Sequence, residues 1–356
     1  MKVSVSPANI KRIDKAGMLD LLSNFPAQCS QARDIGLGSK IFFERKDFTK
    51  IVFAGLGGSA IGADLVRSYL YFESRLPISV CREYELPAYV DSSTLVFILS
   101  YSGNTEETIS AYEQAKRSNA SLVVISSDGE LKESAGKDNI AFIEIPKGVP
   151  PRCALGYLSI IPLVVLNKLG LIPDMSADIA ETATVLEELR DKSLNPRINK
   201  KDNIARYIAD KLFNKLPVIY SSSIYFDAVV TRWRGQINEN SKALALSHVF
   251  PEMNHNEIMG WQNPARLFKD LTVLMLRDKG MHKRIIARMD ISRDIIKKEG
   301  VDILEVSSRG VSLLSRIFSL IYIGDFVSFY LAIIYGVDPT PVDKVAYLKK
   351  RLAESK

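Results

Sequence analysis

The stretch from Ile51 to Arg67 constrains the fold of this chain more than any other. It begins with a short, apolar and partly β-branched run, Ile51–Ala54, which is typical of a buried parallel strand. A glycine-rich turn comes next, and apolar residues at helical spacing then predict a helix over Ser59–Phe72. Such a turn exposes backbone N–H groups and the helix start adds its positive dipole end, so this arrangement can hold an anion.

The glycines of this turn fit no familiar nucleotide signature. Counted from Gly55, Ala60 stands where a dinucleotide fingerprint has its third glycine, and counting from Gly57 gives no Gly-x-Gly pair. The Lys-Ser/Thr pair of a nucleotide triphosphate loop is also missing. Taken alone, the turn is as compatible with a tight connection without a ligand as with an anion site.

A second stretch of the same kind favours phosphate binding. The apolar run Leu95–Leu99 predicts a strand, Thr105–Ser118 predicts a helix, and between them stand Ser100, Ser102, Gly103 and Thr105. Hydroxyls and free N–H groups suit a phosphate monoester, because each can donate to its oxygens without adding charge. Thr105 by itself would be an ordinary helix N-cap. Three hydroxyls beside a second strand–turn–helix favour phosphate binding.

Together the runs Gly57–Gly62 and Ser100–Thr105 resemble the sugar isomerase (SIS) domain. More narrowly, they resemble the bifunctional phosphoglucose/phosphomannose isomerases of archaea and some bacteria. The resemblance implies an α/β fold of two SIS-type domains, each a mostly parallel sheet flanked by helices. It also implies that the substrate phosphate is held by Gly57, Gly58, Ser59, Ser100, Ser102 and Thr105.

The order of predicted elements fits two such domains. The opening forty residues predict one or two helices that pack against the first domain, and apolar strands are then predicted at Ile51–Ala54, Ile78–Cys81, Leu95–Leu99, Leu122–Ile125 and Ala141–Ile145. In the second half the predicted strands are Leu216–Tyr220, Leu271–Leu276 and Ile303–Val306, with helices at Ile224–Ser241 and Lys283–Lys298. We expect an N-terminal SIS domain with its leading helices over 1–170, a helical connector over 171–202 and a C-terminal SIS domain with a C-terminal helix over 203–356.

Composition narrows the possible partners. The net charge of +6 is spread over 356 residues without a basic cluster, which mildly favours anionic ligands and predicts no nucleic-acid partner. Cys29, Cys81 and Cys153 are scattered, so we expect neither disulfides nor a zinc site, and a cytoplasmic location. The most apolar stretch, Val311 to Tyr335, contains Arg316 and Asp325, which predicts a buried helix and no membrane span.

Three polar residues, on different predicted elements, are candidates for chemistry. Arg152 follows a proline-rich loop at the start of a predicted helix, and Glu239 lies roughly opposite an apolar helical stripe. His255 stands in a polar loop sixteen residues after Glu239. Alone, such residues are most often solvated or paired with a neighbour. The resemblance assigns Arg152 to the active site, Glu239 as the base in Asn-Glu-Asn, and His255 as a proton carrier from the partner subunit of a homodimer.

The C-terminal helix adds a lysine. Its apolar face consists of Val342, Val345, Ala346, Leu348 and Leu352, and a 100° projection puts Lys349 in the middle of that face. A lysine on a buried stripe must reach solvent or meet an anionic partner such as a substrate. The resemblance implies a catalytic lysine near the C-terminus; the projection favours Lys349 over Lys344, and the choice between them stays open.

These residues compose an aldose–ketose isomerisation. The resemblance implies interconversion of glucose 6-phosphate and mannose 6-phosphate with fructose 6-phosphate through an enediolate, with no metal and no cofactor. Two alternatives stay open: another SIS-type sugar-phosphate isomerase, and a non-catalytic sugar-phosphate sensor. The sequence does not rank glucose against mannose phosphates.

Overall fold

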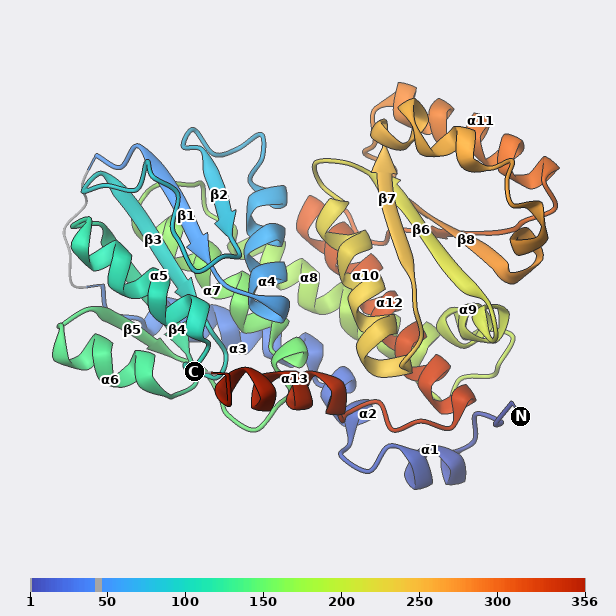
Figure 1. Cartoon of the computed structure of the whole chain (residues 1–356), viewed down its shortest axis with the longest axis horizontal. Coiled ribbons are helices and arrows are strands. Elements are labelled where there is room, and N and C mark those ends of the chain that lie inside the picture. The colour runs from blue at the N-terminus through green and yellow to red at the C-terminus, as the bar shows by residue number, and fades with distance from the viewer. Residues whose placement is uncertain (1, 42–46, 356) are drawn as a thin grey trace.

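The computed structural model describes residues 2–41 and 47–355 and contains two α/β units joined by a layer of helices (Figure 1). The first unit is a five-stranded parallel sheet, sheet A, in the order β2-β1-β3-β4-β5. Its strands are β1 (Lys50–Ala54), β2 (Ile78–Cys81), β3 (Thr94–Leu99), β4 (Ser121–Ser126) and β5 (Ala141–Glu144). Its helices are α4 (Gly57–Tyr69), α5 (Glu106–Arg117) and α6 (Glu130–Lys137). The five strands expected in this half are therefore confirmed.

The second unit is a four-stranded parallel sheet, sheet B, in the order β7-β6-β8-β9. Its strands are β6 (Leu216–Ser222), β7 (Leu246–Phe250), β8 (Leu271–Arg277) and β9 (Asp302–Ser307), and its helices include α10 (Asp227–Ser241) and α11 (Lys283–Lys298). Strand β7 was not expected. It is a mostly half-exposed edge strand whose sequence, Leu-Ser-His-Val-Phe, has no continuous apolar run.

Apart from the last helix, the remaining helices pack on one another and join the two units. They are α1 (Pro7–Ile13), α2 (Met18–Ser23), α3 (Phe25–Gly38), α7 (Leu155–Lys168), α8 (Ser176–Leu189), α9 (Ile204–Leu212) and α12 (Leu313–Tyr335). The opening segment forms three helices rather than one or two, because Gly17 in the left-handed region separates α1 from α2 and Pro26 lies in the first turn of α3. These helices also contact the second half, since Phe25 stacks on Phe318 with ring centroids 5.9 Å apart.

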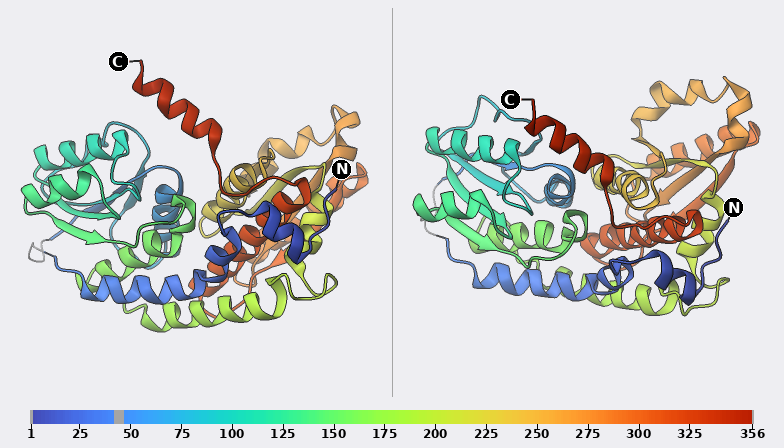
Figure 2. Two further views of the ribbon diagram at one scale, coloured as in Figure 1. Left: turned by 90° about the horizontal axis from the view of Figure 1, so that it is seen from below. Right: turned by 60° about the horizontal axis from the view of Figure 1, so that its bottom comes forward.

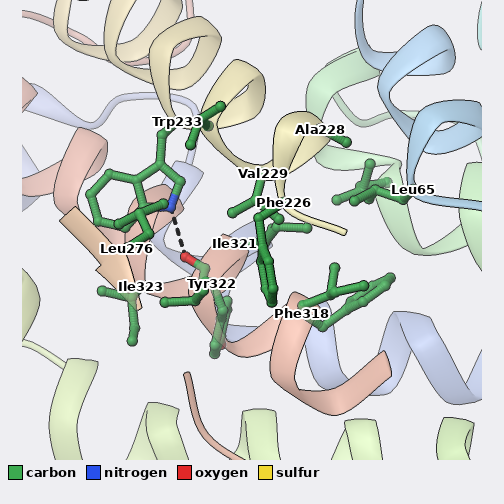
Figure 3. Packing of buried hydrophobic residues seen from close by; sticks show 14 of the residues in the cluster. Leu65, Phe226, Ala228, Val229, Trp233, Leu276, Phe318, Ile321, Tyr322 and Ile323 are labelled. Carbon is green, nitrogen blue, oxygen red and sulfur yellow. Dashed lines mark hydrogen bonds between the residues drawn. The ribbon is translucent and has the colours of Figure 1, made fainter. Parts of the chain in front are cut away.

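Helix α12 is the central core helix. It is long and apolar enough to cross a membrane, but its most apolar window is wholly buried within the protein, and the core helix of a soluble protein passes the same test. Trp233 of α10 packs directly on Gly324 and donates a hydrogen bond from Nε1 to the carbonyl of Leu320 at 2.8 Å (Figure 3). A Cβ on Gly324 would lie 2.4 Å from the indole, so only glycine fits there. The expected buried helix is confirmed.

Helices α4 and α10 pack side by side and join the two halves of the chain. At the end of α4, Arg67 and Ser68 donate to the carboxylate of Asp227, in the first turn of α10, at 2.6 and 2.9 Å. Leu65 and Ala228 lie next to this contact (Figure 3). The end of α4 thus meets the beginning of α10, so the helices run antiparallel, and the beginning of α4 lies near the end of α10.

The last helix, α13 (Asp343–Ala353), projects from the body of the protein beside the first unit (Figure 2). None of its residues is buried. The expectation that Lys349 lies on a buried face of this helix is therefore wrong within one chain, because no other described element covers that face. Its apolar side chains are exposed instead.

Candidate active site

The first turn of α4 presents free backbone donors. Helix α4 begins at Gly57, whose φ of +52° is in the left-handed region, and the N–H of Ser59 bonds to the carbonyl of Leu56 at 3.0 Å. The preceding N–H groups of Gly57 and Gly58 come too early in the helix to have an intrahelical acceptor. A Cβ on Gly58 would meet the carbonyl of Pro151 at 3.1 Å, so glycine lets Arg152 approach this turn closely.

The turn after β3 supplies the hydroxyl groups. Ser100 Oγ donates to Thr105 Oγ1 and accepts from the N–H of Gly103, both at 3.2 Å. Thr105 is the N-cap residue of α5, yet its side chain makes no capping hydrogen bond, so the ordinary capping role is wrong. The turn after β1 adjoins the end of β3, because a Cβ on Gly55 would lie 2.9 Å from the carbonyl of Leu99. The hydroxyls of the turn after β3 thus lie beside the start of α4, which carries Ser59.

Arg152 is a buried hub between the two halves of the chain. Only 4% of it is exposed. Its Nε donates to Asn240 Oδ1 at 2.7 Å, and its Nη2 donates to the carbonyls of Pro339 and Thr340 at 2.8 and 2.9 Å. Its Nη1 lies 3.5 Å from Glu239 Oε2. Arg152 is therefore a fixed positive charge aimed at a carboxylate, not the solvated arginine that composition alone favours.

A cavity of about 270 Å³ opens between α4, α10 and Arg152. Gly57 and Gly58 line it on one side and Glu239 on the other. Its charged lining is that single carboxylate and four guanidinium groups, those of Arg82, Arg152, Arg232 and Arg234. A cavity with this excess of positive charge suits an anionic ligand.

Three of the four arginines already have carboxylate partners. Arg82 pairs with Asp64, Arg152 lies beside Glu239, and Arg232 binds the buried Asp325 at 2.7 Å. Within residues 2–41 and 47–355, Arg234 has no ion-pair partner. Its charge is available to a ligand.

The shell around Arg152 was not expected from the sequence. Arg232 donates to the backbone carbonyl of Arg152 at 3.0 Å, and Gln236 donates to Asp325 at 3.0 Å. Burial raises the pKa of Asp325, and the adjacent Arg232 opposes this rise. One feature of the sequence could have indicated this shell: Asp325 is a carboxylate in the middle of an apolar helix, and such a group needs a buried partner.

A second cavity, of about 510 Å³, adjoins Glu239 and is lined in part by Lys242, Val342 and Lys344. Lys242 donates to the carbonyls of Glu239 and Pro339 at 2.6 and 3.2 Å. Burial, followed by the charge of Arg152, lowers the pKa of Lys242. Lys344 therefore shares a cavity with Glu239, whereas Lys349 lies further along α13 and is exposed.

His255 lies far from this site within one chain. It is exposed and follows β7, at the carboxyl edge of sheet B. Helix α10 runs back from the carboxyl end of β6, so Glu239 lies near the opposite edge, and a helix of 15 residues is about 22 Å long. The structure thus brings together Gly57, Gly58, Arg152 and Glu239, with the hydroxyl turn alongside, and does not bring His255 or Lys349 to them. Among the described residues no group of three or more His, Cys, Asp or Glu could hold a metal ion.

Two domain profiles match this architecture. The SIS domain matches residues 46–148, and the bacterial phospho-glucose isomerase C-terminal SIS domain matches residues 201–352. The fold and the site therefore define a protein of two SIS domains. The solved structure of a glucose-6-phosphate isomerase like protein from Thermus thermophilus has the same fold, with a TM-score of 0.62 and 18% identity over 96% of this chain and 98% of that chain.

The curated relatives identify the family. A bifunctional phosphoglucose/phosphomannose isomerase from Caldicellulosiruptor bescii is 47% identical over 95% of this chain and 100% of its own length. One from Aquifex aeolicus is 38% identical over 87% of this chain and 94% of its own. The chain belongs to the bifunctional phosphoglucose/phosphomannose isomerase family.

Proposed function

We propose that this protein interconverts glucose 6-phosphate and mannose 6-phosphate with fructose 6-phosphate. One observation carries the proposal: Arg152 and Glu239 face each other in a cavity that the first turn of α4 also lines. A carboxylate can move a carbon-bound proton, and a fixed guanidinium can stabilise the oxyanion that results. A sugar-phosphate isomerase needs both groups beside a phosphate site.

The phosphate binds at the two helix starts. The N–H groups of Gly57 and Gly58 and the hydroxyls of Ser59, Ser100, Ser102 and Thr105 donate to its oxygens. These donors carry no charge of their own, and the positive ends of the α4 and α5 dipoles add to them. The sugar then extends from this point toward Glu239.

The isomerisation passes through an enediolate. Glu239 removes the C2 hydrogen of the open-chain aldose as a proton, and the electron pair of that bond forms the C1–C2 double bond as O1 takes up negative charge. Arg152 stabilises this oxyanion. O1 is then protonated, O2 loses its proton to give the C2 carbonyl, and Glu239 returns its proton to C1. The electron pair stays within the substrate, so the route needs no redox cofactor, and the fixed charge of Arg152 takes the place that a metal ion could have beside the oxyanion.

Glucose 6-phosphate and mannose 6-phosphate differ at C2 only, and that centre is lost in the enediolate. Both aldoses therefore lead to the same intermediate, which supports activity on both. Which of them is made faster depends on the face from which Glu239 returns the proton to C2.

Ring opening comes first and uses two further groups. His255 of a second copy and Lys349 transfer protons at the ring oxygen and the anomeric hydroxyl. The distance between the edges of sheet B that carry His255 and Glu239 supports a homodimer whose sites are completed across the interface. Cys29, Cys81 and Cys153 are all free thiols, which suits the cytoplasm.

The test is turnover of fructose 6-phosphate in chelator-treated buffer, with both aldose phosphates assayed separately. Formation of glucose 6-phosphate and mannose 6-phosphate is the expected result. Tight binding of fructose 6-phosphate without turnover would favour a sensor, and a different product would favour another SIS-type isomerase.

A further inference from the structure

Helix α13 has an apolar face that nothing in the described chain covers. Val345, Leu348 and Leu352 are 46%, 57% and 53% exposed and recur at the spacing of one helix face. An isolated helix of 11 residues is marginal in water, so its stability has to come from packing. The face therefore needs a partner.

The segment around His255 has complementary properties. We call residues Glu252–Gly260 the His255 segment. It contains no lysine or arginine and two carboxylates, of which Glu257 is already engaged by His248 and Tyr220 and Glu252 has no cationic partner among the described residues. Its Met259 is 74% exposed. Helix α13 contains three lysines and an arginine against one carboxylate, that of Asp343. The His255 segment thus offers one exposed apolar side chain, Met259, and one negative charge, Glu252, to the apolar and basic side chains of α13.

The two surfaces cannot meet within one chain. Helix α13 starts next to Thr340, whose carbonyl accepts from Arg152, and so begins near Glu239. The His255 segment of the same chain is at the other edge of sheet B, and α13 spans only about 16 Å. A second copy that brings its His255 to Glu239, however, has to place its His255 segment beside the start of α13.

We propose that α13 docks on the His255 segment of a second copy of this chain. Val345, Leu348 and Leu352 pack on Met259 of that copy, and the basic side chains of α13 face its Glu252. This inference rests on the proposed function, because the shared site is what brings the two surfaces together. Helix α13 of one copy then holds His255 of the other copy in the cavity beside Glu239.

The test is photo-crosslinking from position 348. Leu348 is replaced by p-benzoylphenylalanine, and protein made with natural isotopes is mixed with protein labelled with ¹⁵N and allowed to exchange subunits. The expected product joins position 348 of one copy to residues 252–260 of the other, in mixed light–heavy pairs. A crosslink within one chain, a crosslink to another part of the partner, or no crosslink would overturn the proposal.

Matched substitutions measure the same contact at equilibrium. Leu348→Ser and Met259→Ser should each raise the dimer dissociation constant at least tenfold in sedimentation experiments. If the two side chains contact each other, the double variant should raise this constant by less than the product of the two single effects. Ile291→Ser is the control, because Ile291 is 61% exposed on α11 and belongs to neither surface. Its dissociation constant should equal that of the unaltered protein.

Isomerase assays separate this proposal from the function on which it rests. If the unaltered protein turns over fructose 6-phosphate as a dimer but the crosslinks miss residues 252–260, the docking fails and the function stands. If the protein dimerises with the expected crosslinks but turns nothing over, the function fails and the contact stands.

Discussion

The guanidinium of Arg152 lies 3.5 Å from the carboxylate of Glu239, although the two residues come from different halves of the chain. Arg152 is held by three other acceptors, on Asn240, Pro339 and Thr340, and so does not depend on Glu239 for its position. The carboxylate is the freer partner, with 41% of its side chain exposed. This asymmetry suits a fixed electrostatic group beside a base that has to accept and return a proton.

Replacing Glu239, the proposed base, should lower turnover strongly and leave the fold intact. Glu239→Gln keeps the shape of the side chain but removes its basicity, so we expect kcat to fall by about 10²- to 10⁴-fold with little change in KM. The melting temperature should hardly move, because the Glu239 side chain is partly exposed and the buried Arg152 keeps its three other acceptors. Glu299→Gln, the same replacement at an exposed position at the end of α11 that lines neither cavity, is the control and should keep its activity. Full turnover by Glu239→Gln would remove Glu239 from the mechanism.

Two inactive variants should complement each other if the sites are shared. A mixed dimer of Glu239→Gln and His255→Ala chains contains one site with both groups intact, made of Glu239 from one copy and His255 from the other. After subunit exchange at equal concentrations, about a quarter of the unaltered activity should return, since half of the dimers are mixed and each has one working site. If both groups of a site came from one chain, mixing would restore no activity.

The two candidate lysines can be separated by kinetics. We expect Lys349→Met to lower the rate of ring opening, and therefore turnover of the cyclic substrate, by about 10²-fold, as for a proton-transfer group. Lys344→Met, on the same helix, should have a small effect. Lys344 shares a cavity with Glu239. A large loss of turnover in Lys344→Met together with a small loss in Lys349→Met would therefore assign the proton transfer to Lys344. Methionine keeps the apolar stem in both cases, so helix packing is matched.

Arg234 should contribute to binding rather than to the chemical step. It lines the cavity and its charge has no carboxylate partner among the described residues, so Arg234→Met should raise KM about tenfold and change kcat little, as for a lost charge-assisted hydrogen bond to an anion. Arg234→Lys should recover part of the loss. The inhibition constant of inorganic phosphate should rise in parallel with KM. A fall in kcat with constant KM would contradict this assignment.

Two thiols should resist alkylation in the folded protein. Burial raises the pKa of Cys29 to about 12 and that of Cys153 to about 11, so at pH 8 almost none of either is the reactive thiolate. We expect iodoacetamide to label neither residue in native protein over hours and both within minutes in denaturant. Labelling should begin in native protein only at strongly alkaline pH. Peptide mapping that finds Cys29 alkylated at pH 8 would show that its surroundings open more than the structure indicates.

Much of the fold was predictable because its strands are buried on both faces. Strands such as Leu95–Leu99 are continuous apolar runs between turn residues, and the structure places them within about one residue of the expected bounds. Strand β7 was missed because an edge strand is half exposed and its pattern is weak. Ser100 stood out because it is one of three hydroxyl residues that follow a predicted strand, whereas Glu239 was selected only by the resemblance of its Asn-Glu-Asn segment to the family.

Contacts between distant segments were beyond the reach of the sequence. The acceptors of Arg152 include backbone carbonyls of residues 339 and 340, which no side-chain pattern encodes. The burial of α13 within the same chain was predicted wrongly for a related reason. The helical periodicity identified its apolar face, but a sequence pattern does not show which molecule covers such a face. The projection of Lys349 onto that face is unchanged; only its expected burial within the same chain was wrong.

The bond from the Tyr322 hydroxyl to the carbonyl of Leu22, 2.8 Å long, joins residues 300 positions apart. During synthesis the first helices therefore leave the ribosome long before the helix that covers them exists. Met18, Leu22 and Phe25 are each less than 5% exposed in the finished protein, and their packing on α12 can form only after α12 has been translated. The first helices therefore cannot complete their native core during the synthesis of the residues that separate them from α12.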